Sequence, residues 1–420
     1  MYRAFVLFCI ACGLCTVVSM TLAADENDEL IPHSSAPVTT LKSPAAKKVN
    51  TWYKAGTAPG NIGDVYDNRD RAHSLLHLQR YPQLTQHQYT DTEVKENIDF
   101  GAQLKIVPGI VFGNLSTSSG VMSGGSNARH YYTRSQGLDL LHRQYRANNL
   151  YVYPEHRDHD PGHNGLPGYG DLFPANTPFL ITSQGSSGSD QPFLRALPLV
   201  LAAFRPKVKQ RLVRNGLLMP TIQMILRTTY PKSIPKNHYL NAASHPSVFD
   251  GTEINPLAMA KLAHTIKPDD IPPIVRLRVL NETPVFRGKD FFDPQPSEIL
   301  TNTPAVIARV FRGAAYKRKT RISAEDGFDL NNRDLKFNWV LLRGDANKVR
   351  ITPQDEQNST ADIEVTYQPR APIADGSIAS NRIDVGVFAH NSKYYSAPAF
   401  VTWFSLDHES RVYAEDGRVL

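Results

Sequence analysis

The chain has 420 residues, of which 20% are charged and 41% are hydrophobic, and its formal net charge is +6. This small charge on a long chain is typical of a globular protein with a sizeable core. No nucleic-acid-binding motif accompanies it, so we expect no nucleic-acid partner. All three cysteines lie at positions 9, 12 and 15, which excludes a disulfide scaffold and thiolate chemistry in the rest of the chain.

Residues 1–24 have the pattern of a signal peptide. Arg3 is followed by an uncharged apolar run over residues 4–18 and by small residues before Asp25. This pattern predicts cleavage after Ala23 or Ala24. An uncleaved membrane anchor is the alternative, although the run is short for a bilayer span. We therefore expect a secreted or periplasmic mature chain, with a net charge of +5 after the loss of Arg3 and no transmembrane segment.

The next part of the chain predicts a linker and then a mixed α/β domain. Residues 25–50 are rich in Ser, Thr, Pro, Ala and Lys, and predict a disordered linker. Residues 51–270 predict the α/β domain, with irregular structure over residues 51–80 and alternating strand and helix patterns from about residue 100 to residue 230. The expected strands are residues 103–112, 150–153 and 178–182, and the expected helices are residues 135–148, 206–215, 217–228 and 255–266, with one more running from a cap at Ser189 or Asp190 through Phe204.

From residue 271 to residue 408 the pattern changes to short runs of alternating apolar and polar residues. These runs are separated by Gly, Asn, Asp and Pro, and no helical pattern lies between them. They predict an all-β immunoglobulin/PKD-like sandwich, followed by a tail over residues 409–420. The expected strands are residues 274–280, 305–311, 335–341, 363–367, 383–388 and 399–404.

One stretch of this region resembles a known module. Residues 323–331 (SAEDGFDLN), followed by residues 335–339 (LKFNW), resemble the turn and strand of the PKD-type immunoglobulin-like family. The resemblance implies an extracellular spacer or adhesion module, with Trp339 as its core tryptophan. The whole chain also resembles uncharacterised exported proteins of planctomycete-like bacteria, which implies no activity.

The segment from residue 153 to residue 190 concentrates the chemistry of the sequence. Six imidazoles and carboxylates fall within nine positions, and Gly and Pro exclude a regular helix or strand there. Such a loop predicts a site for a divalent cation (zinc, manganese or calcium), and a hydrogen-bonded polar loop is the alternative. The candidate metal ligands are His156, Asp158, His159, Asp160 and His163, and Glu155 is a candidate catalytic carboxylate.

Two further groups of residues are weaker candidates. Ser186 and Ser187 lie between a predicted strand and a predicted helix, where a nucleophilic serine would be exposed, and a base would come from the histidine cluster. The alternative for these serines is a glycine-rich helix cap. The second group could complete a site, although solvent-facing or satisfied histidines are the simpler explanation; it consists of His73, His77 and His87 near Asp64, Asp67 and Asp70.

These patterns lead to two hypotheses of different classes. The first is an exported hydrolase-like protein that acts on an extracellular polymer or ester, with a cation at the His/Asp loop to polarise the substrate or activate water. The second is a non-enzymatic envelope or matrix protein whose β-sandwich is adhesive. In both, the expected partner is an extracellular or envelope polymer such as a polysaccharide. The basic cluster at residues 317–321 is expected to be a solvated face.

Overall fold

The structure is a computed structural model, and it describes residues 34–101, 103–116, 131, 134–155, 173–185, 188–232, 239–292, 294–373, 378–406 and 414–416. Residues His33–Leu420 form one compact unit. The helices are α1 (Pro44–Lys54), α2 (Asp91–Lys95), α4 (Ser135–Arg146), α5 (Gln191–Ala203), α6 (Pro206–Arg214), α7 (Leu218–Thr228) and α8 (Pro256–Thr265), with short 3-10 turns at η1 (Leu78–Arg80), η2 (Ile98–Phe100), η6 (Ala242–Ser244) and η7 (Ala346–Lys348).

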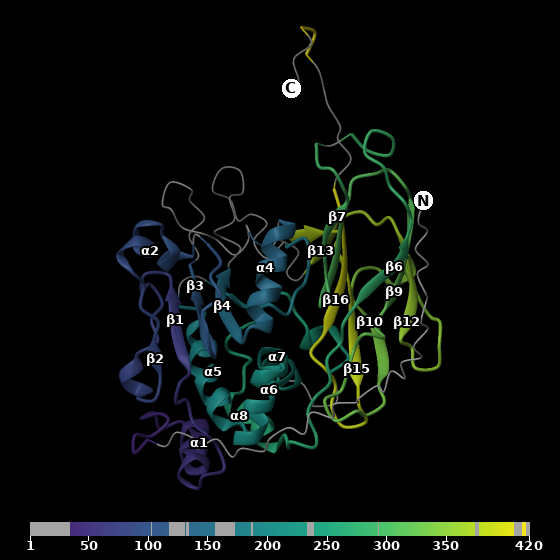
Figure 1. Ribbon diagram of the computed structural model, residues 1–420. Helices are drawn as coiled ribbons and strands as arrows, with labels where there is room; N and C mark the ends of the chain where they lie inside the picture. Colours follow the sequence, from purple (N-terminus) through teal and green to yellow (C-terminus); the bar gives the residue numbers. More distant parts are fainter. Residues whose placement is uncertain are drawn as a thin grey trace, which may run out of the picture. The chain divides into compact units, whose positions relative to one another are not determined.

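The N-terminal part is an α/β structure built on a parallel sheet (Figure 1). Its strands are β1 (Val65–Arg69), β2 (Thr85–Gln86), β3 (Val111–Leu115), β4 (Asn149–Glu155) and β5 (Leu180–Gln184). They are ordered β2-β1-β3-β4-β5, and every neighbouring pair is parallel. The prediction of an α/β region is therefore confirmed. The prediction of irregular structure over residues 51–80 was wrong, because β1 lies there inside the sheet.

Helix α1 replaces part of the expected linker. The Ser43 hydroxyl accepts a hydrogen bond from the Ala46 N–H at 3.2 Å and so caps the helix, and Pro44 occupies its first turn. The apolar residues that this helix buries are Ala45, Ala46, Val49 and Tyr53. Their helical spacing gives one buried face, so the linker prediction does not hold for residues 44–50.

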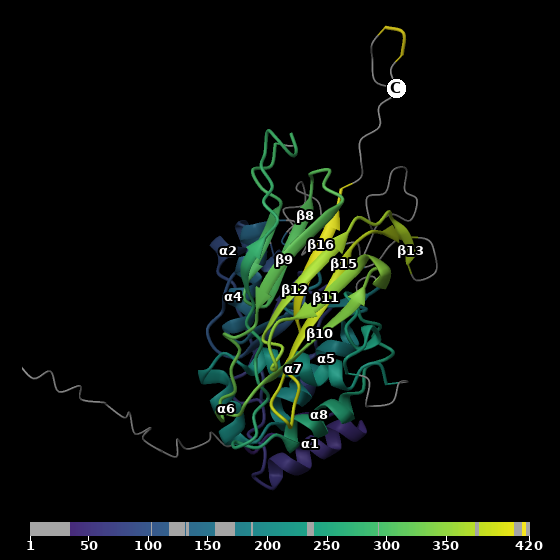
Figure 2. The ribbon, with the colours of Figure 1, turned by 90° about the vertical axis from the view of Figure 1, so that its right-hand side faces the viewer.

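Helix α5 is the most apolar helix of the N-terminal part, and ten of the thirteen residues in its sequence QPFLRALPLVLAA are buried. A helix with so much apolar surface must pack against other elements. Helices α1 and α8 pack against it, and the three lie together in both ribbon views (Figures 1 and 2). The polar site described below lies beside the start of α5, in this group of helices.

The C-terminal part is rich in antiparallel strands (Figure 2). One sheet has the order β10-β15-β16-β8-β7, a second has the order β11-β12-β9-β6, and β13 pairs with β14. All of these pairs are antiparallel except β8 and β16. The strands are β6 (Arg278–Glu282), β7 (Ile299–Thr303), β8 (Val306–Phe311), β9 (Lys317–Ser323), β10 (Lys336–Arg343), β11 (Val349–Pro353), β12 (Thr360–Thr366), β13 (Ala371–Ile373), β14 (Ile378–Ser380), β15 (Ile383–His390) and β16 (Ala399–Ser405).

The two larger C-terminal sheets share one hydrophobic core. Val387 on β15 and Trp403 on β16 pack in the same buried cluster as Ile322 on β9 and Ile363 on β12. Side chains alternate along a strand, so the neighbouring Phe388 faces the other way. It joins the core of the N-terminal part, where its ring centroid lies 4.8 Å from that of His245.

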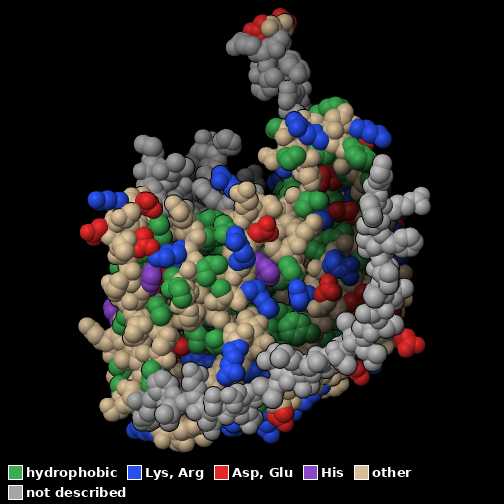
Figure 3. All heavy atoms as spheres, in the orientation of Figure 1, with side chains coloured by type: hydrophobic (Ala, Val, Ile, Leu, Met, Phe, Trp, Pro, Cys, Tyr) green, Lys and Arg blue, Asp and Glu red, His purple; other side chains and the backbone are tan. Residues whose placement is uncertain are grey.

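Two expectations for this region need correction. Trp339 is only partly buried, with its indole N–H donating to the Asn358 carbonyl oxygen at 2.7 Å, and the buried tryptophan is Trp403, at 2% exposure. The second concerns strand β9, which was not predicted; the basic cluster at residues 317–321 lies on it, and Lys317, Lys319 and Arg321 are exposed, as expected of a solvated face. Its charges lie among opposite charges, since Lys319 and Arg321 both pair with Asp362, at 3.0 and 2.6 Å. On the face shown in Figure 3, basic and acidic side chains are likewise interspersed.

A buried ion pair ties the C-terminal part to the N-terminal part. The Arg382 and Asp384 side chains are 1% and 2% exposed and lie 2.8 Å apart. Arg382 also donates to the Phe173 carbonyl oxygen at 2.7 Å and to the Ser247 hydroxyl. The separation into domains at residues 51–270 and 271–408 stays a prediction. Within the described ranges, the structure contains no helix that is both long and apolar enough to cross a bilayer.

Strands β1 and β3 lie so close together at Gly113 that one added methyl group there should destabilise the protein severely. A Cβ on Gly113 would lie 1.7 Å from the Asp67 carbonyl oxygen, which no rotamer can relieve. We expect Gly113→Ala to lower the free energy of unfolding by about 3 kcal/mol or more, measured by urea denaturation. Gly63→Ala is the control: it has a φ of 84° but no atom within 4 Å, so it should cost only the backbone strain of about 1 kcal/mol. Equal costs for the two variants would contradict the packing argument.

Candidate functional site

The polar residues of the N-terminal part gather where the strand order reverses. The chain runs from β1 outward to β2 and then returns across β1 to β3, β4 and β5. In open parallel sheets, ligands bind outside the carboxyl ends of the strands at such a reversal, because the connections leave on opposite faces. Here Asn68 and Arg69 are the last two residues of β1, and Asp70 follows directly. On β3, Asn114 is the register partner of Asn68.

The turn after β1 holds Asp70 in place through strained backbone. Arg71 and Ala72 have φ values of 52° and 66°, in the left-handed region that non-glycine residues rarely adopt. The Asn68 side-chain oxygen accepts the Ala72 N–H at 2.8 Å, and Arg71 pairs with Asp99 at 3.1 Å, so both ends of the turn are fixed. Two consecutive strained residues at the end of a central strand point to a functional position.

Ser74 is the hub of the hydrogen-bond network at this edge. Its carbonyl oxygen accepts from the Asn114 amide at 2.8 Å and from the Asn68 amide at 3.2 Å. The Tyr66 hydroxyl donates to the Asn114 side-chain oxygen at 2.9 Å, which fixes the orientation of that amide. Strands β1 and β3 therefore position the backbone of Ser74 from two sides.

The Ser74 side chain connects this network to helix α5. Its hydroxyl donates to the Asp190 carboxylate, directly before the first residue of the helix, and accepts from the Gln191 amide at 3.3 Å. The Gln191 amide also donates to the Leu75 carbonyl oxygen at 3.0 Å. Asp190 is fully buried and Asp70 is 3% exposed. Two buried carboxyl groups thus interact with Ser74, Asp190 with its hydroxyl and Asp70 with its backbone N–H.

Burial changes the acidity of both carboxyl groups. Burial and the nearby charge of Asp190 together raise the pKa of Asp70 from 3.8 to about 6, against the opposing effects of Asn68, His73 and the Ser74 N–H. Burial also raises the pKa of Asp190 to about 6, against the Ser74 hydroxyl and nearby backbone N–H groups. One oxygen of each, Asp70 Oδ1 and Asp190 Oδ2, is buried with no hydrogen-bond partner among the described residues. Buried polar atoms without a partner are rare in proteins and need a proton or a ligand.

Two other candidate aspartates are structural. The Asp67 carboxylate accepts hydrogen bonds from Arg69 at 2.8 Å, Tyr151 at 2.7 Å and Tyr89 at 2.5 Å. Asp64 pairs with the buried Lys209 at 2.8 Å. Their carboxylates are paired with buried cations and hydrogen-bond donors, and this is how proteins usually retain buried charges. Only Asp70 of this predicted group lies in the polar site.

The predicted histidines do not converge. The His73 imidazole contacts the Asp70 carbonyl oxygen at 2.5 Å, while His87 packs edge-on against Tyr89 and burial lowers its pKa. His77 lines a separate cavity, described below. Across the residues that the structure describes, no three His, Cys, Asp or Glu side chains come together as a metal-binding group.

The principal sequence candidates lie outside the described residues. This holds for the five predicted metal ligands His156, Asp158, His159, Asp160 and His163, and for the serines Ser186 and Ser187. Glu155 is the last residue of β4, with its backbone in register with Gln184 on β5, and its side chain is not described. Those predictions remain predictions.

The glycines that flank the two serines are required by the backbone. Gly185 and Gly188 have φ values of 127° and 99°, which residues with a side chain rarely adopt. The Ser183 and Ser189 hydroxyls lie 2.9 Å apart and bring the two sides of this segment together. The glycines thus explain the composition of the segment without requiring a nucleophilic serine.

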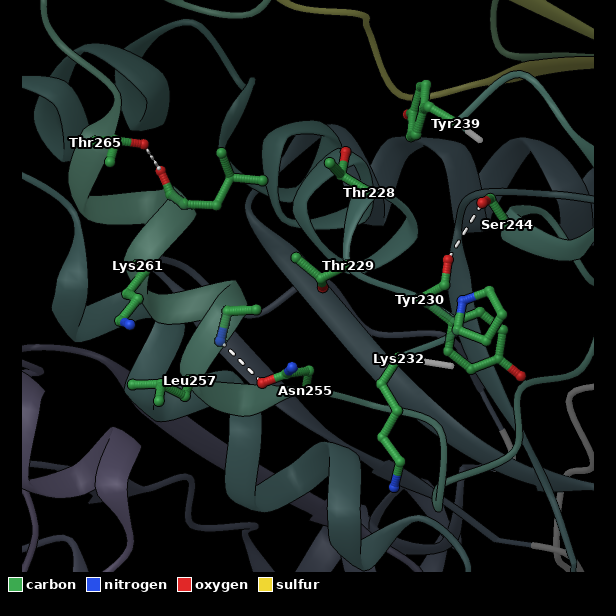
Figure 4. Close-up of a pocket in the computed structure, with 13 residues that line it drawn as sticks. Thr228, Thr229, Tyr230, Lys232, Tyr239, Ser244, Asn255, Leu257, Lys261 and Thr265 are labelled. Atoms are coloured by element: carbon green, nitrogen blue, oxygen red, sulfur yellow. Dashed lines mark hydrogen bonds between the residues drawn. The ribbon is translucent and has the colours of Figure 1, made fainter. Parts of the chain in front are cut away.

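A separate pocket of about 470 Å³ lies between the end of α7 and helix α8 (Figure 4). The described residues that line it include no carboxylate. The Thr228 and Thr229 hydroxyls donate hydrogen bonds to the backbone carbonyl oxygens of Met224 and Ile225, at 2.7 and 2.9 Å. This pocket offers space and two lysines, Lys232 and Lys261, but no acid–base pair. The Asp70 and Asp190 site is therefore the better candidate for chemistry.

No protein-family model matches the sequence, and no curated protein matches it. Among solved structures, the chain matches a nucleoside hydrolase-related hypothetical protein from Saccharophagus degradans that is described as associated with carbohydrate metabolism. The identity is 10%, the match covers 88% of this chain and 89% of that chain, and the TM-score is 0.25. A similarity this weak shows neither a shared fold nor a shared activity.

The raised pKa values predict that an amide at either carboxyl position stabilises the protein at high pH. Each carboxyl group has a pKa near 6 when folded and near 4 when unfolded. The folded state therefore binds protons more tightly, and each group's contribution to stability is full below about pH 4 and is lost as the pH rises through about 6. An amide does not ionise, so Asp190→Asn should exceed the wild type in unfolding free energy by about 1 to 3 kcal/mol at about pH 8 and match it at about pH 4.

Urea denaturation in EDTA at the two pH values measures this difference. The control is Asp326→Asn, which removes a carboxylate that is 51% exposed and should change stability by less than about 1 kcal/mol at both pH values. Lower stability of Asp190→Asn at the higher pH would contradict the raised pKa.

Proposed function

We propose that the protein is an exported hydrolase in which Asp70 and Asp190 are the general acid and general base. The observation that supports this most directly is the pair itself: two buried carboxyl groups, each with an oxygen that lacks a partner within the described residues, at the strand-order reversal of a parallel sheet. Two carboxyl groups with raised pKa values near neutral pH suit acid–base catalysis, because one can hold a proton while the other is ionised.

Hydrolysis of a glycosidic bond illustrates the proposed chemistry. The protonated carboxyl group donates its proton to the leaving oxygen as the carbon–oxygen bond breaks. The ionised partner accepts a proton from a water molecule, whose oxygen forms the new bond to the sugar carbon. The sum is the addition of one water molecule across the bond. An ester would be cleaved by the same proton transfers, so the proposed substrate is a glycosidic or ester bond of an extracellular polymer.

We further propose that the C-terminal sheets are an immunoglobulin/PKD-like sandwich that attaches the protein to its polymer. The shared core of the two sheets is compatible with that fold. The segment between β6 and β7 carries Phe286 and Phe292, which are 56% and 81% exposed. Its backbone is ordered by bonds such as the Gly288 N–H to the Phe291 carbonyl oxygen at 2.7 Å. In this proposal the two exposed phenylalanines contact the polymer, because aromatic side chains are enriched at binding surfaces.

These aromatic residues also favour the second candidate function, a non-enzymatic envelope or matrix protein. In that case the C-terminal part binds the polymer and the carboxyl pair has no catalytic role. A chain with Phe286 and Phe292 both replaced by Ser separates the two functions. If the protein is a hydrolase, this variant still turns over a small soluble substrate. If the protein is purely adhesive, its one measurable activity is retention on the polymer, and the variant loses it.

The activity test uses the two carboxyl positions one at a time. Turnover of 4-methylumbelliferyl glycosides and esters, and release of reducing ends from polysaccharides, are measured for the wild type, Asp70→Asn and Asp190→Asn. We expect each variant to lower kcat by about 100-fold or more, because acid–base groups contribute about 10² to 10⁴ in rate. The wild-type rate should be highest near pH 6, where one carboxyl group is protonated and the other ionised.

The exposed Asp326→Asn variant is the matched control and should keep the wild-type rate. Full activity of Asp70→Asn or Asp190→Asn would contradict the assignment. So would a wild type that hydrolyses none of these bonds.

A cation at the His/Asp segment stays a separate proposal, with oxygen and imidazole ligands suited to zinc, manganese or calcium. Metal analysis by plasma mass spectrometry on the purified chain, beside a His156→Ala/His159→Ala double variant, tests it. We expect about one metal ion per wild-type chain and its loss in the variant. A metal-free wild type whose melting temperature does not change with added zinc, manganese or calcium would contradict it.

A further inference from the structure

A second cavity, which we call the basic cavity, lies beside the carboxyl pair. It has a volume of about 420 Å³ and is formed by residues before α1, by the η1 segment, by the outer side of α5 and by residues before α8. Its charged lining residues are Lys42, Arg80 and Arg195, with His77 beside them, and none of the described residues that line it is an aspartate or glutamate. The nearby acids Asp250 and Glu253 do not line it.

The three cations of the basic cavity are not used by the protein itself. In the part of the chain that the structure describes, none of their side chains forms a salt bridge or a hydrogen bond. This differs from other arginines of the chain, such as Arg69, Arg309 and Arg382, which all pair with carboxylates. Like charges held near one another without a counter-charge repel, and an anionic ligand relieves that repulsion.

The floor of the basic cavity is formed by buried, largely apolar side chains. Leu76, Tyr81 and Leu199 are 2%, 1% and 3% exposed. The Tyr81 hydroxyl donates to the Arg195 carbonyl oxygen at 3.4 Å. Burial raises the pKa of Tyr81 to about 12, and the charges of Arg195 and Arg80 oppose that shift, so both guanidinium groups act on the same buried phenol. An apolar floor under a cationic rim fits a ring-shaped ligand that carries an oxyanion.

Helix starts add to the positive potential of the basic cavity. The N-cap of α1, Ser43, and the first residues of α5 and α8, Gln191 and Pro256, line the cavity, so the positive ends of three backbone dipoles lie at its wall. Figures 1 and 2 show these three helices lying together. The cavity and its unpaired cations carry the inference, and the helix starts only strengthen the potential.

Gln191 links the basic cavity to the carboxyl pair. It lines the cavity, and its amide donates to the Ser74 hydroxyl, which in turn donates to Asp190. Two side chains, Gln191 and Ser74, therefore connect the cavity to the Asp190 carboxyl group. A chain-like substrate with its reacting bond at the carboxyl pair would place a neighbouring unit in this cavity.

We propose that the basic cavity is a binding site for an anionic sugar unit, whose carboxylate or sulfate group contacts Arg80 and Arg195. A volume of about 420 Å³ is within the range of small-ligand sites. Planar guanidinium groups bind carboxylate and sulfate oxygens with paired hydrogen bonds. The conclusion that the substrate is an acidic polysaccharide rests on the proposed hydrolase function. The proposal that the cavity binds an anionic sugar unit does not depend on that function.

The test is isothermal titration calorimetry on the full chain with three tetrasaccharides. Tetragalacturonate supplies carboxylates, a sulfated carrageenan tetrasaccharide supplies sulfates, and maltotetraose is neutral. We expect at least one anionic sugar to bind about tenfold or more tightly than maltotetraose, and its affinity to fall when NaCl is raised from about 0.05 to about 0.5 M. The anionic sugar that binds more tightly identifies the oxyanion.

Variants separate this site from a general charge effect and from catalysis. Arg80→Gln/Arg195→Gln should weaken binding by about tenfold or more, and because both side chains are exposed and unpaired within the described chain, the variant should keep the wild-type melting temperature. Arg214→Gln/Arg276→Gln removes the same charge from exposed arginines outside the cavity and should leave binding unchanged. Asp190→Asn should keep the binding even where it abolishes hydrolysis.

Two results would overturn the inference. One is equal binding of neutral and anionic sugars, and the other is unchanged binding by the Arg80→Gln/Arg195→Gln variant. If binding behaves as expected but no bond is cleaved, the proposed hydrolase function fails and the basic cavity remains an anionic sugar site.

Discussion

The burial of two carboxyl groups around Ser74 is the constraint on which the site depends. Removing a charged carboxylate from water is unfavourable, and a second one nearby makes the charged state still less favourable. At Asp70 and Asp190 this unfavourable free energy raises the pKa values to about 6. Asp64 and Asp67, in contrast, have lysine, arginine and tyrosine partners. A carboxyl pair with no lysine or arginine partner among the described residues, next to fully paired ones, indicates a position kept for function rather than for stability.

The architecture around this pair follows from a few packing requirements. Gly113 lets β3 approach β1 closely, the strained turn at Arg71 and Ala72 brings Asp70 back toward Ser74, and the apolar helix α5 sets Asp190 against the same serine. The side of α5 that is not covered by the sheet borders the basic cavity. One helix thus serves both the proposed catalytic pair and the proposed anion site, which are connected through the Gln191 and Ser74 side chains.

The sequence predicted the broad fold better than the site. Period-two patterns identified six C-terminal strands, but they missed β7, β9, β11, β13 and β14. In β9 the alternation is hidden by basic residues such as Lys317 and Lys319. The five residues of β1 were missed since Val65–Arg69 contains one aliphatic residue and three polar ones, whose burial depends on partners distant in sequence. Propensity cannot show such tertiary pairing.

The site was only partly predictable for the same reason. Asp70 appeared in a weak group with three histidines, and Asp190 appeared only as a helix cap. Ser74 and Asn114 carried no sequence signal, because their roles come from contacts across 116 and 40 residues of chain. The available clue was the dense run of polar residues after Tyr66, directly at the end of a strand. The predicted His/Asp ligands and the serines Ser186 and Ser187 lie outside the described residues and are still open to experiment.

The most direct test of the carboxyl pair is its titration by ¹³C NMR of the aspartate side-chain carboxyl carbons, assigned with the Asp70→Asn and Asp190→Asn variants. The structure predicts that both resonances titrate near pH 6 and that loss of either carboxyl group lowers the midpoint of the other, because the two charges repel. Midpoints near 4 for both groups, or no effect of one variant on the other residue, would contradict a coupled, buried carboxyl pair.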